Sequence, residues 1–348
     1  MNSRRVYQWV RRESKGWVEV NRHFRQNGVV FSRGLAACQS SQLRKIAGCV
    51  GGRADSQRRG LQRFVGQTGS LSGFFKAWTR SIVQAIGDPE LVLAVDETKL
   101  RDKLGVLLVG AVYQGRCIPL AWRVYRANGA ADYPAQGQAR LIIGLLNTVR
   151  AGLPRRLKVR VLADRGIGTS PRLMRGIMAL GWTFLFRLTR LSKIVLANGQ
   201  ALTFAQQVSA PGQTFAASGL VFKQRGRIPA HVRVVWGYQA QQPWSLVTND
   251  PSLTGWEYAQ RMWQEEAFRD FKSFGFNLEN AALDDPQRLS FLLVLLSVAY
   301  AWLLLWGRAR ELAGLTVAPK KRKDGSCVRR YSLFREGRQA FLSALPFF

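Results

Sequence analysis

The sequence has few residues that bind zinc, and these show no metal-site spacing. Its four cysteines, at positions 38, 49, 117 and 327, form no Cys-x-x-Cys pair, and its two histidines, His23 and His231, lie far apart. A zinc site is therefore not expected. The scattered cysteines indicate free thiols. Because no apolar signal segment follows the basic residues 1–13, we expect a cytoplasmic protein.

Acidic residues are also scarce. The 348 residues include 52 lysines and arginines but only 21 aspartates and glutamates, so the formal net charge is +31. Such a charge implies a polyanionic partner. Nucleic acid is the first candidate, and an anionic membrane surface is the second. An apolar fraction of 47% with 11% aromatic residues excludes a disordered basic chain, and the length allows two or three domains.

One apolar run, residues 289–307, carries no charge and is long enough to span a bilayer. It follows Asp284-Asp285-Pro286, which is typical of a helix start, and Arg288 lies in the first turn. A single run of this kind in a strongly basic chain favours a buried core helix over a membrane span. We therefore predict no membrane partner.

Residues 1–87 are predicted to form a basic helical DNA-binding region. Residues 43–50 and 56–65 are short amphipathic segments separated by a turn-rich stretch, which is typical of a helix-turn-helix. The second segment carries three arginines that could contact phosphates or bases: Arg58, Arg59 and Arg63. A basic helical bundle without a recognition helix explains the pattern equally well. Residues 71–86 predict a linking helix that ends at Gly87.

Residues 88–189 alternate between strand and helix patterns. A buried strand over 91–95 ends in Asp96, and Asp164 likewise follows a buried strand directly. The predicted order is strands over 91–95, 105–113 and 116–125, a helix over 134–151, a strand over 157–163, a helix over 171–180 and a strand over 183–188. This is the order of an α/β, ribonuclease-H-like (retroviral-integrase-like) core.

Residues 190–250 hold short alternating strands where that order would lead directly to a last helix. We therefore expect a β-rich insertion before the closing helices of the core, which occupy residues 251–310. Residues 311–348 form a basic C-terminal tail. Its lysine and arginine clusters are expected to be solvated, and contact with DNA or a second subunit is the alternative.

Residues 256–274 are predicted to form one helix with two unlike faces. The apolar face carries Trp256, Trp263, Ala267, Phe271 and Phe274. The polar face carries Tyr258, Arg261, Glu265, Arg269 and Lys272. Taken alone, the polar face favours ordinary ion pairs in solvent. The alternative is a metal-binding Glu265 flanked by groups that bind phosphates.

Asp96, Asp164 and Glu265 are the candidate catalytic and metal-binding residues. Each aspartate alone would be interpreted as a turn or cap residue, but their joint position in so basic a chain favours phosphodiester chemistry. Mg²⁺ takes oxygen ligands and needs no histidine or cysteine. Two such ions could activate a nucleophile and stabilise the leaving oxygen. We expect Asp96 to bridge the ions, Asp164 and Glu265 to hold one each, and Mn²⁺ to substitute.

These residues resemble motifs of bacterial insertion-sequence transposases with an Asp-Asp-Glu triad. The family's tyrosine-arginine-glutamate-lysine signature is matched at every spacing by Tyr258-x2-Arg261-x3-Glu265-x6-Lys272. VLADRG around Asp164 looks like the family's second-aspartate motif, and DETK around Asp96 resembles its first. The resemblance covers about residues 90–310, whereas the preceding residues match only loosely.

The resemblance implies a cut-and-paste DNA transposase, associated with the nucleoid, that cleaves transposon ends through a hairpin and joins them to target DNA. It also implies a homodimer across two terminal inverted repeats. The expected DNA contacts are Tyr258, Arg261, Arg269, Lys272, Arg165 and Trp244. Of these, Trp244 would stack on an extruded base. The alternatives are a nuclease on the same fold without strand transfer, and an inactive relic that only binds DNA.

Overall fold

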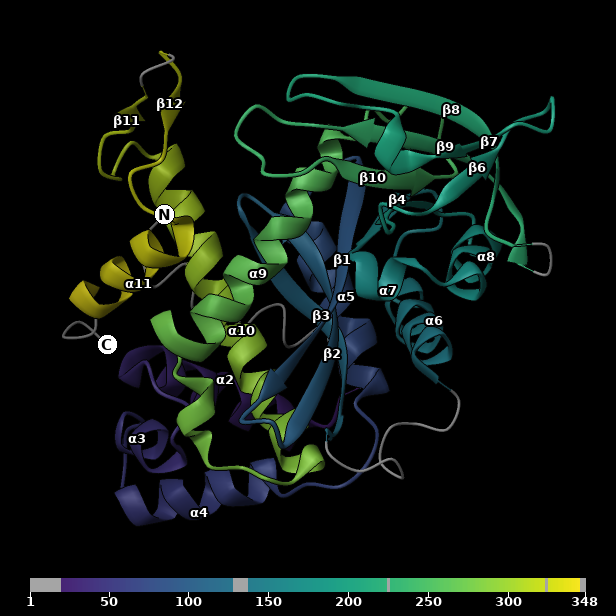
Figure 1. The fold of residues 1–348 in the computed structure, drawn as a ribbon. Helices are drawn as coiled ribbons and strands as arrows, with labels where there is room; N and C mark the ends of the chain where they lie inside the picture. Colours follow the sequence, from purple (N-terminus) through teal and green to yellow (C-terminus); the bar gives the residue numbers. More distant parts are fainter. Residues whose placement is uncertain (1–19, 128–136, 224–225, 323–324, 345–348) are drawn as a thin grey trace.

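The computed structural model describes residues 20–127, 137–223, 226–322 and 325–344. Over these residues the chain is a mixed α/β protein built on a ten-stranded sheet (Figure 1). The strand order is β3-β2-β1-β4-β5-β10-β9-β8-β6-β7. The sheet is mixed because β4 lies parallel to β1 and β5, whereas β2 is antiparallel to both of its neighbours, β1 and β3.

The first five strands form where the sequence predicts them. They are β1 (Glu90–Leu100), β2 (Leu104–Tyr113), β3 (Arg116–Arg126), β4 (Lys158–Ala163) and β5 (Thr183–Arg187). The prediction that the first strand ends at Asp96 is wrong, because β1 continues to Leu100. Beyond Val95 it loses its parallel partner β4 but still pairs with β2, from Asp96 opposite Leu108 onward.

The strands of residues 190–250 continue the same sheet. They are β6 (Lys193–Val195), β7 (Ala201–Thr203), β8 (Thr214–Val221), β9 (Ile228–Val235) and β10 (Trp244–Thr248). The junction is the antiparallel pairing of β10 with β5, in which Val247 lies opposite Phe186. The β-rich segment, at the top right of Figure 1, is therefore hydrogen-bonded directly to the strand that precedes it in the chain.

Helices surround the sheet. They are α2 (Arg22–Cys38), α3 (Leu43–Gly48), α4 (Ala54–Val65), α5 (Ser72–Ile86), α6 (Gly137–Arg150), α7 (Arg165–Gly168), α8 (Pro171–Ala179), η1 (Phe204–Gln206), η3 (Trp256–Arg261), α9 (Met262–Arg269), η4 (Asp270–Phe274), η5 (Leu278–Ala281), α10 (Pro286–Leu312) and α11 (Leu333–Ala344). The two predicted amphipathic segments form α3 and α4. Residues 1–19 of the predicted DNA-binding region, and residues 134–136 of a predicted helix, lie outside the described residues.

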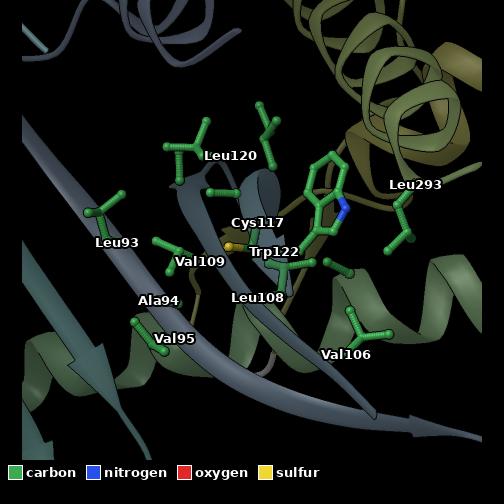
Figure 2. Packing of buried hydrophobic residues seen from close by; sticks show 14 of the residues in the cluster. Leu93, Ala94, Val95, Val106, Leu108, Val109, Cys117, Leu120, Trp122 and Leu293 are labelled. Atoms are coloured by element: carbon green, nitrogen blue, oxygen red, sulfur yellow. The ribbon is translucent and has the colours of Figure 1, made fainter. Parts of the chain in front are cut away.

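The long apolar run forms α10, the central helix of the core. In its most apolar window 89% of the residues are buried, so the prediction of a core helix is confirmed. The Asp285 side chain caps its first turn by accepting from the Arg288 amide. Leu293 lies near Trp122 of β3, and both belong to the buried apolar cluster that includes the aliphatic side chains of β1 and β2 (Figure 2). On the other side of α10, Phe24 of α2 and Phe64 of α4 each contact Phe291.

The C-terminal segment contains a short hairpin and a packed helix. In the hairpin, β11 (Lys320–Lys321) pairs with β12 (Cys327–Val328), and the lysines of β11 are exposed. The following helix, α11, is not solvated, because its side chains Phe334 and Phe341 are buried against α10. Gly337 and Gly307 let the two helices approach closely, since a Cβ atom on either would overlap backbone of the opposing segment.

Residues 256–274 do not form one regular helix. The 3₁₀ turn η3 leads into α9, which ends in the π-helical turn η4. A 3₁₀ turn rotates by 120° per residue and an α-helix by 100°, so the predicted faces shift in phase. The helical period predicts Trp256 and Phe274 on the apolar face, but they are 45% and 62% exposed. Tyr258 and Arg261, which it predicts on the polar face, are buried. That part of the two-face prediction is wrong.

Replacing Gly337 by alanine should destabilise the protein, because the added methyl group would overlap the Leu303 carbonyl. We expect a loss of about 1–3 kcal/mol in the free energy of unfolding, measured by chemical denaturation. Gly144→Ala in α6 is the matched control. Nothing lies within 4 Å of its Cβ position, so alanine should stabilise that helix by up to about 1 kcal/mol. Equal effects of the two changes would contradict the close α10–α11 contact.

Candidate active site

Asp96 lies in the middle of the sheet, at the point where β1 and β4 separate. Successive strand residues point to opposite faces, so Asp96 shares a face with Ala94, whose partner on β4 is Leu162. One carboxylate oxygen accepts from the Glu97 amide at 2.9 Å, and the other accepts from the Arg261 guanidinium at 2.9 Å. The residue is only 8% exposed. A buried carboxylate of this kind needs a charged partner, and Arg261 provides it.

Asp164 follows the last residue of β4 and forms the N-cap of α7. Its Oδ1 accepts from the Ile167 amide at 3.1 Å. Its Oδ2 lies 3.7 Å from Arg261 Nη2. Asp96 and Asp164 both follow the last parallel pair of β1 and β4, Val95 opposite Ala163, and so they lie at the same level of the sheet.

Glu265 is held over the two aspartates by α9, which packs across β1, β2 and β3 (Figure 1). Its carboxylate accepts from Arg261 Nη1, one helical turn earlier. Arg261 therefore bridges all three candidate acids, with Nη2 toward the aspartates and Nη1 toward the glutamate. The structure brings Asp96, Asp164 and Glu265 together around this one guanidinium.

Burial raises the pKa of the Asp96 carboxyl to about 6, and the nearby Asp164 and Glu265 carboxylates also raise it. The Arg261 guanidinium and the Glu97 amide act in the opposite direction and lower it. The site therefore holds several carboxylates where water solvates them poorly. Binding of a cation is favourable in such a place, because it stabilises the ionised carboxylates.

The acids adjacent to the candidate residues point elsewhere. Glu97 projects from the opposite face of β1, where it accepts from Tyr125 and, at 3.0 Å, from Gln138 of α6. Glu266 is turned away from the triad and pairs with Arg269 at 2.8 Å. Neither competes with Asp96 or Glu265 for the site.

Tyr258 and Trp244 pack together beside the triad. Tyr258 is buried in a small apolar cluster with Leu162, and its ring lies edge-on to Trp244 at 5.3 Å. Burial raises the pKa of the Tyr258 phenol. Trp244 is half-buried and also contacts Trp256, which is the more exposed of the two indoles. The assignment of base stacking to Trp244 stays a prediction.

The other predicted DNA-binding residues are spread over α7, α9, η4 and α4. Lys272 Nζ donates to the Lys99 carbonyl at 2.6 Å, near the end of β1. Arg165 is exposed directly after Asp164, in the first turn of α7. Arg269 faces Glu266. The three predicted arginines on α4, Arg58, Arg59 and Arg63, are exposed. Arg58 forms a surface ion pair with Asp55.

The donor set suits a hard divalent cation, because all three side chains are carboxylates that already converge on positive charge. Among the described residues, no three histidine, cysteine, aspartate or glutamate side chains are close enough together to hold one ion. The guanidinium of Arg261 lies between the acids, so ion binding requires it to move aside. The two-ion Mg²⁺ site, with Mn²⁺ as substitute, stays a prediction.

Asp270 lies beside the site and was not predicted from the sequence. Asp270, in the π-helical turn, is buried and accepts from Arg116 Nε at 2.6 Å and from the Tyr300 hydroxyl at 2.9 Å. This network fastens the end of α9 to β3 and α10. Its sequence signal is only an acid on a helix that also carries Glu265 and Glu266, which does not single it out.

No known protein-family profile matches this chain, and a search of curated proteins finds no similar sequence.

The raised pKa of Asp96 predicts a pH-dependent stability difference between the wild type and Asp96→Asn. Folded Asp96 binds its proton more tightly than the unfolded carboxyl, whose pKa is 3.8, so wild-type stability falls as pH rises toward about 6. Asparagine does not titrate. From about pH 4 to pH 7, the free energy of unfolding of Asp96→Asn relative to wild type should rise by up to about 3 kcal/mol in denaturant titrations. Parallel pH profiles would show that Asp96 titrates normally.

Proposed function

We propose that this protein is a DNA transposase with an Asp-Asp-Glu triad. It would cleave transposon ends in a divalent-metal-dependent reaction and join them to target DNA. The observation that carries the proposal is the convergence of Asp96, Asp164 and Glu265, from two neighbouring strands and one covering helix, on Arg261. Arg261 and Glu265 belong to the same four-residue signature that the sequence shares with such enzymes.

The proposed architecture is a ribonuclease-H-like core. In its support, the succession β1-β2-β3-α6-β4-α8-β5 is the one expected for that core, and β4 lies directly beside β1. The β-rich segment then occupies the expected place before the helix that carries Glu265. The net charge of +31 supports DNA as the partner.

In this proposal the three carboxylates would hold one or two Mg²⁺ ions. When bound, such ions supply Lewis-acid stabilisation of the attacked phosphate and lower the pKa of a nucleophilic water or 3′-hydroxyl. Asp96 and Asp164 are fixed by strand and cap hydrogen bonds, so their oxygens are preorganised. Arg261 would exchange its carboxylate partners for a DNA phosphate, to which a guanidinium can donate two parallel hydrogen bonds.

Residues outside the triad would position the DNA. Exposed Arg165 lies beside Asp164, and exposed arginines line α4, so both surfaces could neutralise phosphates. Trp244 and Trp256 lie next to Tyr258 and could provide an aromatic surface for an unpaired base. A homodimer would place one such site at each transposon end.

Asp96→Asn should abolish DNA cleavage while Glu97→Gln should not. Both changes neutralise one acid on β1, but Glu97 faces α6 on the other side of the sheet. We expect Asp96→Asn to lower the cleavage rate by ~100-fold or more, because several kcal/mol of transition-state stabilisation are lost. The substrate is linear DNA carrying the sequences that flank this reading frame, with Mg²⁺ or Mn²⁺. Full activity of Asp96→Asn would refute the triad.

Strand transfer is tested separately, with a pre-cut transposon end and a target plasmid. A transposase gives joined product, and Glu265→Gln should abolish it. Cleavage without any joined product would favour the nuclease alternative. Binding without cleavage or joining would favour a DNA-binding relic.

A further inference from the structure

A second basic site lies between α9 and α11, outside the triad. It is a pocket of about 250 Å³ whose lining includes four arginines from three parts of the chain: Arg116, Arg269, Arg335 and Arg338. A buried water occupies about 30 Å³, so the pocket has room for a phosphate group. Arg269 follows Glu265 by one helical turn, and Glu266, which is turned away from the triad, also lines the pocket, so the pocket is adjacent to the triad on α9 but separate from it.

The two acids that line the pocket are already paired. Asp270 is bound by Arg116 at 2.6 Å and by the Tyr300 hydroxyl. Glu266 lies between Arg269, at 2.8 Å, and Arg116, at 3.7 Å. Arg116 and Arg269 therefore neutralise the two acids of the pocket. The positive charges of Arg335 and Arg338 are not neutralised by them.

Arg335 and Arg338 provide that excess charge. Within the described part of the chain, neither lies within ion-pair distance of an acid. Arg335 lies 4.0 Å over the ring of Tyr331, and Arg338 donates through Nη1 to the Phe274 carbonyl at 2.8 Å. The Nε of Arg338 is buried and has no hydrogen-bond partner. Guanidinium groups without an acidic partner, around a small pocket, are well suited to bind phosphate oxygens.

An exposed aromatic ring favours a nucleic acid over a free anion. Phe274 is 62% exposed at the edge of the pocket, and the Arg269 guanidinium lies 5.2 Å over its ring. Such a ring can contact a sugar or base of the strand whose phosphate lies in the pocket, as in aromatic surfaces that bind single strands. It offers no comparable contact to inorganic phosphate.

We propose that this pocket binds a phosphate of the DNA backbone other than the phosphate at the triad. The inference rests on the proposed function for the identity of the polymer. The proposal assigns a DNA contact to α11, a helix of the C-terminal segment in which the sequence shows no DNA-binding motif.

The test is the salt dependence of DNA binding by Arg335→Ala/Arg338→Ala, measured with a duplex oligonucleotide in EDTA so that no cleavage occurs. Each phosphate contact contributes about 0.9 to the slope of log affinity against log salt. The double variant should show a slope shallower by about 1 and an affinity about 10-fold lower. Arg155→Ala/Arg156→Ala removes the same charge from an exposed loop outside the pocket and should leave the slope unchanged.

Folding is controlled by thermal melting and by Arg335→Lys/Arg338→Lys, which keeps the charge and should restore most of the slope. An unchanged slope in the alanine variant, or an equal decrease in the loop control, would overturn the proposal. Competition by inorganic phosphate that is lost in the variant while the DNA slope stays the same would overturn the assignment to DNA. A shallower slope in a chain that does not cleave DNA would support the pocket and count against the proposed activity alone.

Discussion

The central part of the structure depends on one guanidinium among three carboxylates. Asp96 and Arg261 are both buried, and each tolerates burial because the other neutralises it. The pair also joins segments 165 residues apart, since Asp96 lies on the first strand and Arg261 follows the whole β-rich segment. When η3 and α9 pack on the sheet, they therefore also bring the guanidinium that neutralises the acids.

This arrangement bears on the proposed activity. If Arg261 pairs with DNA phosphate in the complex, the carboxylates lose their internal cation at the moment when a substrate arrives. The acids would then be free to take up metal ions only beside bound DNA. Such an exchange would limit cleavage of DNA that is not held by the signature residues.

Much of the fold could be predicted from the sequence, because it depends on local patterns. The positions of β1 and β4 were predictable from apolar runs that end near an acidic residue. The position of α10 was predictable from the helix start at Asp285-Pro286. The predictions failed where backbone geometry departs from a regular period. The faces of residues 256–274 were partly misassigned, because η3 and η4 are not α-helical. Nothing in the sequence shows that β10 pairs with β5, or that α11 packs on α10.

The candidate site was predictable to the same extent. The three acids are brought together as expected, whereas the central position of Arg261 is a tertiary feature that spacing cannot indicate. The same holds for the contact of Asp270 with Arg116 and Tyr300, which joins three elements that are distant in the chain. Long-range ion pairs depend on the packing of whole elements, and the sequence specifies them only through the completed fold.

The packing of α2 and α4 on α10 determines when the chain can fold. Residues 22–65 bury Phe24 and Phe64 against a helix that is synthesised only after residue 285. Contacts between such distant segments raise the contact order of a fold, and a higher contact order slows folding and leaves apolar surface exposed in the meantime. The N-terminal helices must therefore wait for nearly the whole chain, and a nascent chain that stops before α10 has no helix to close its core.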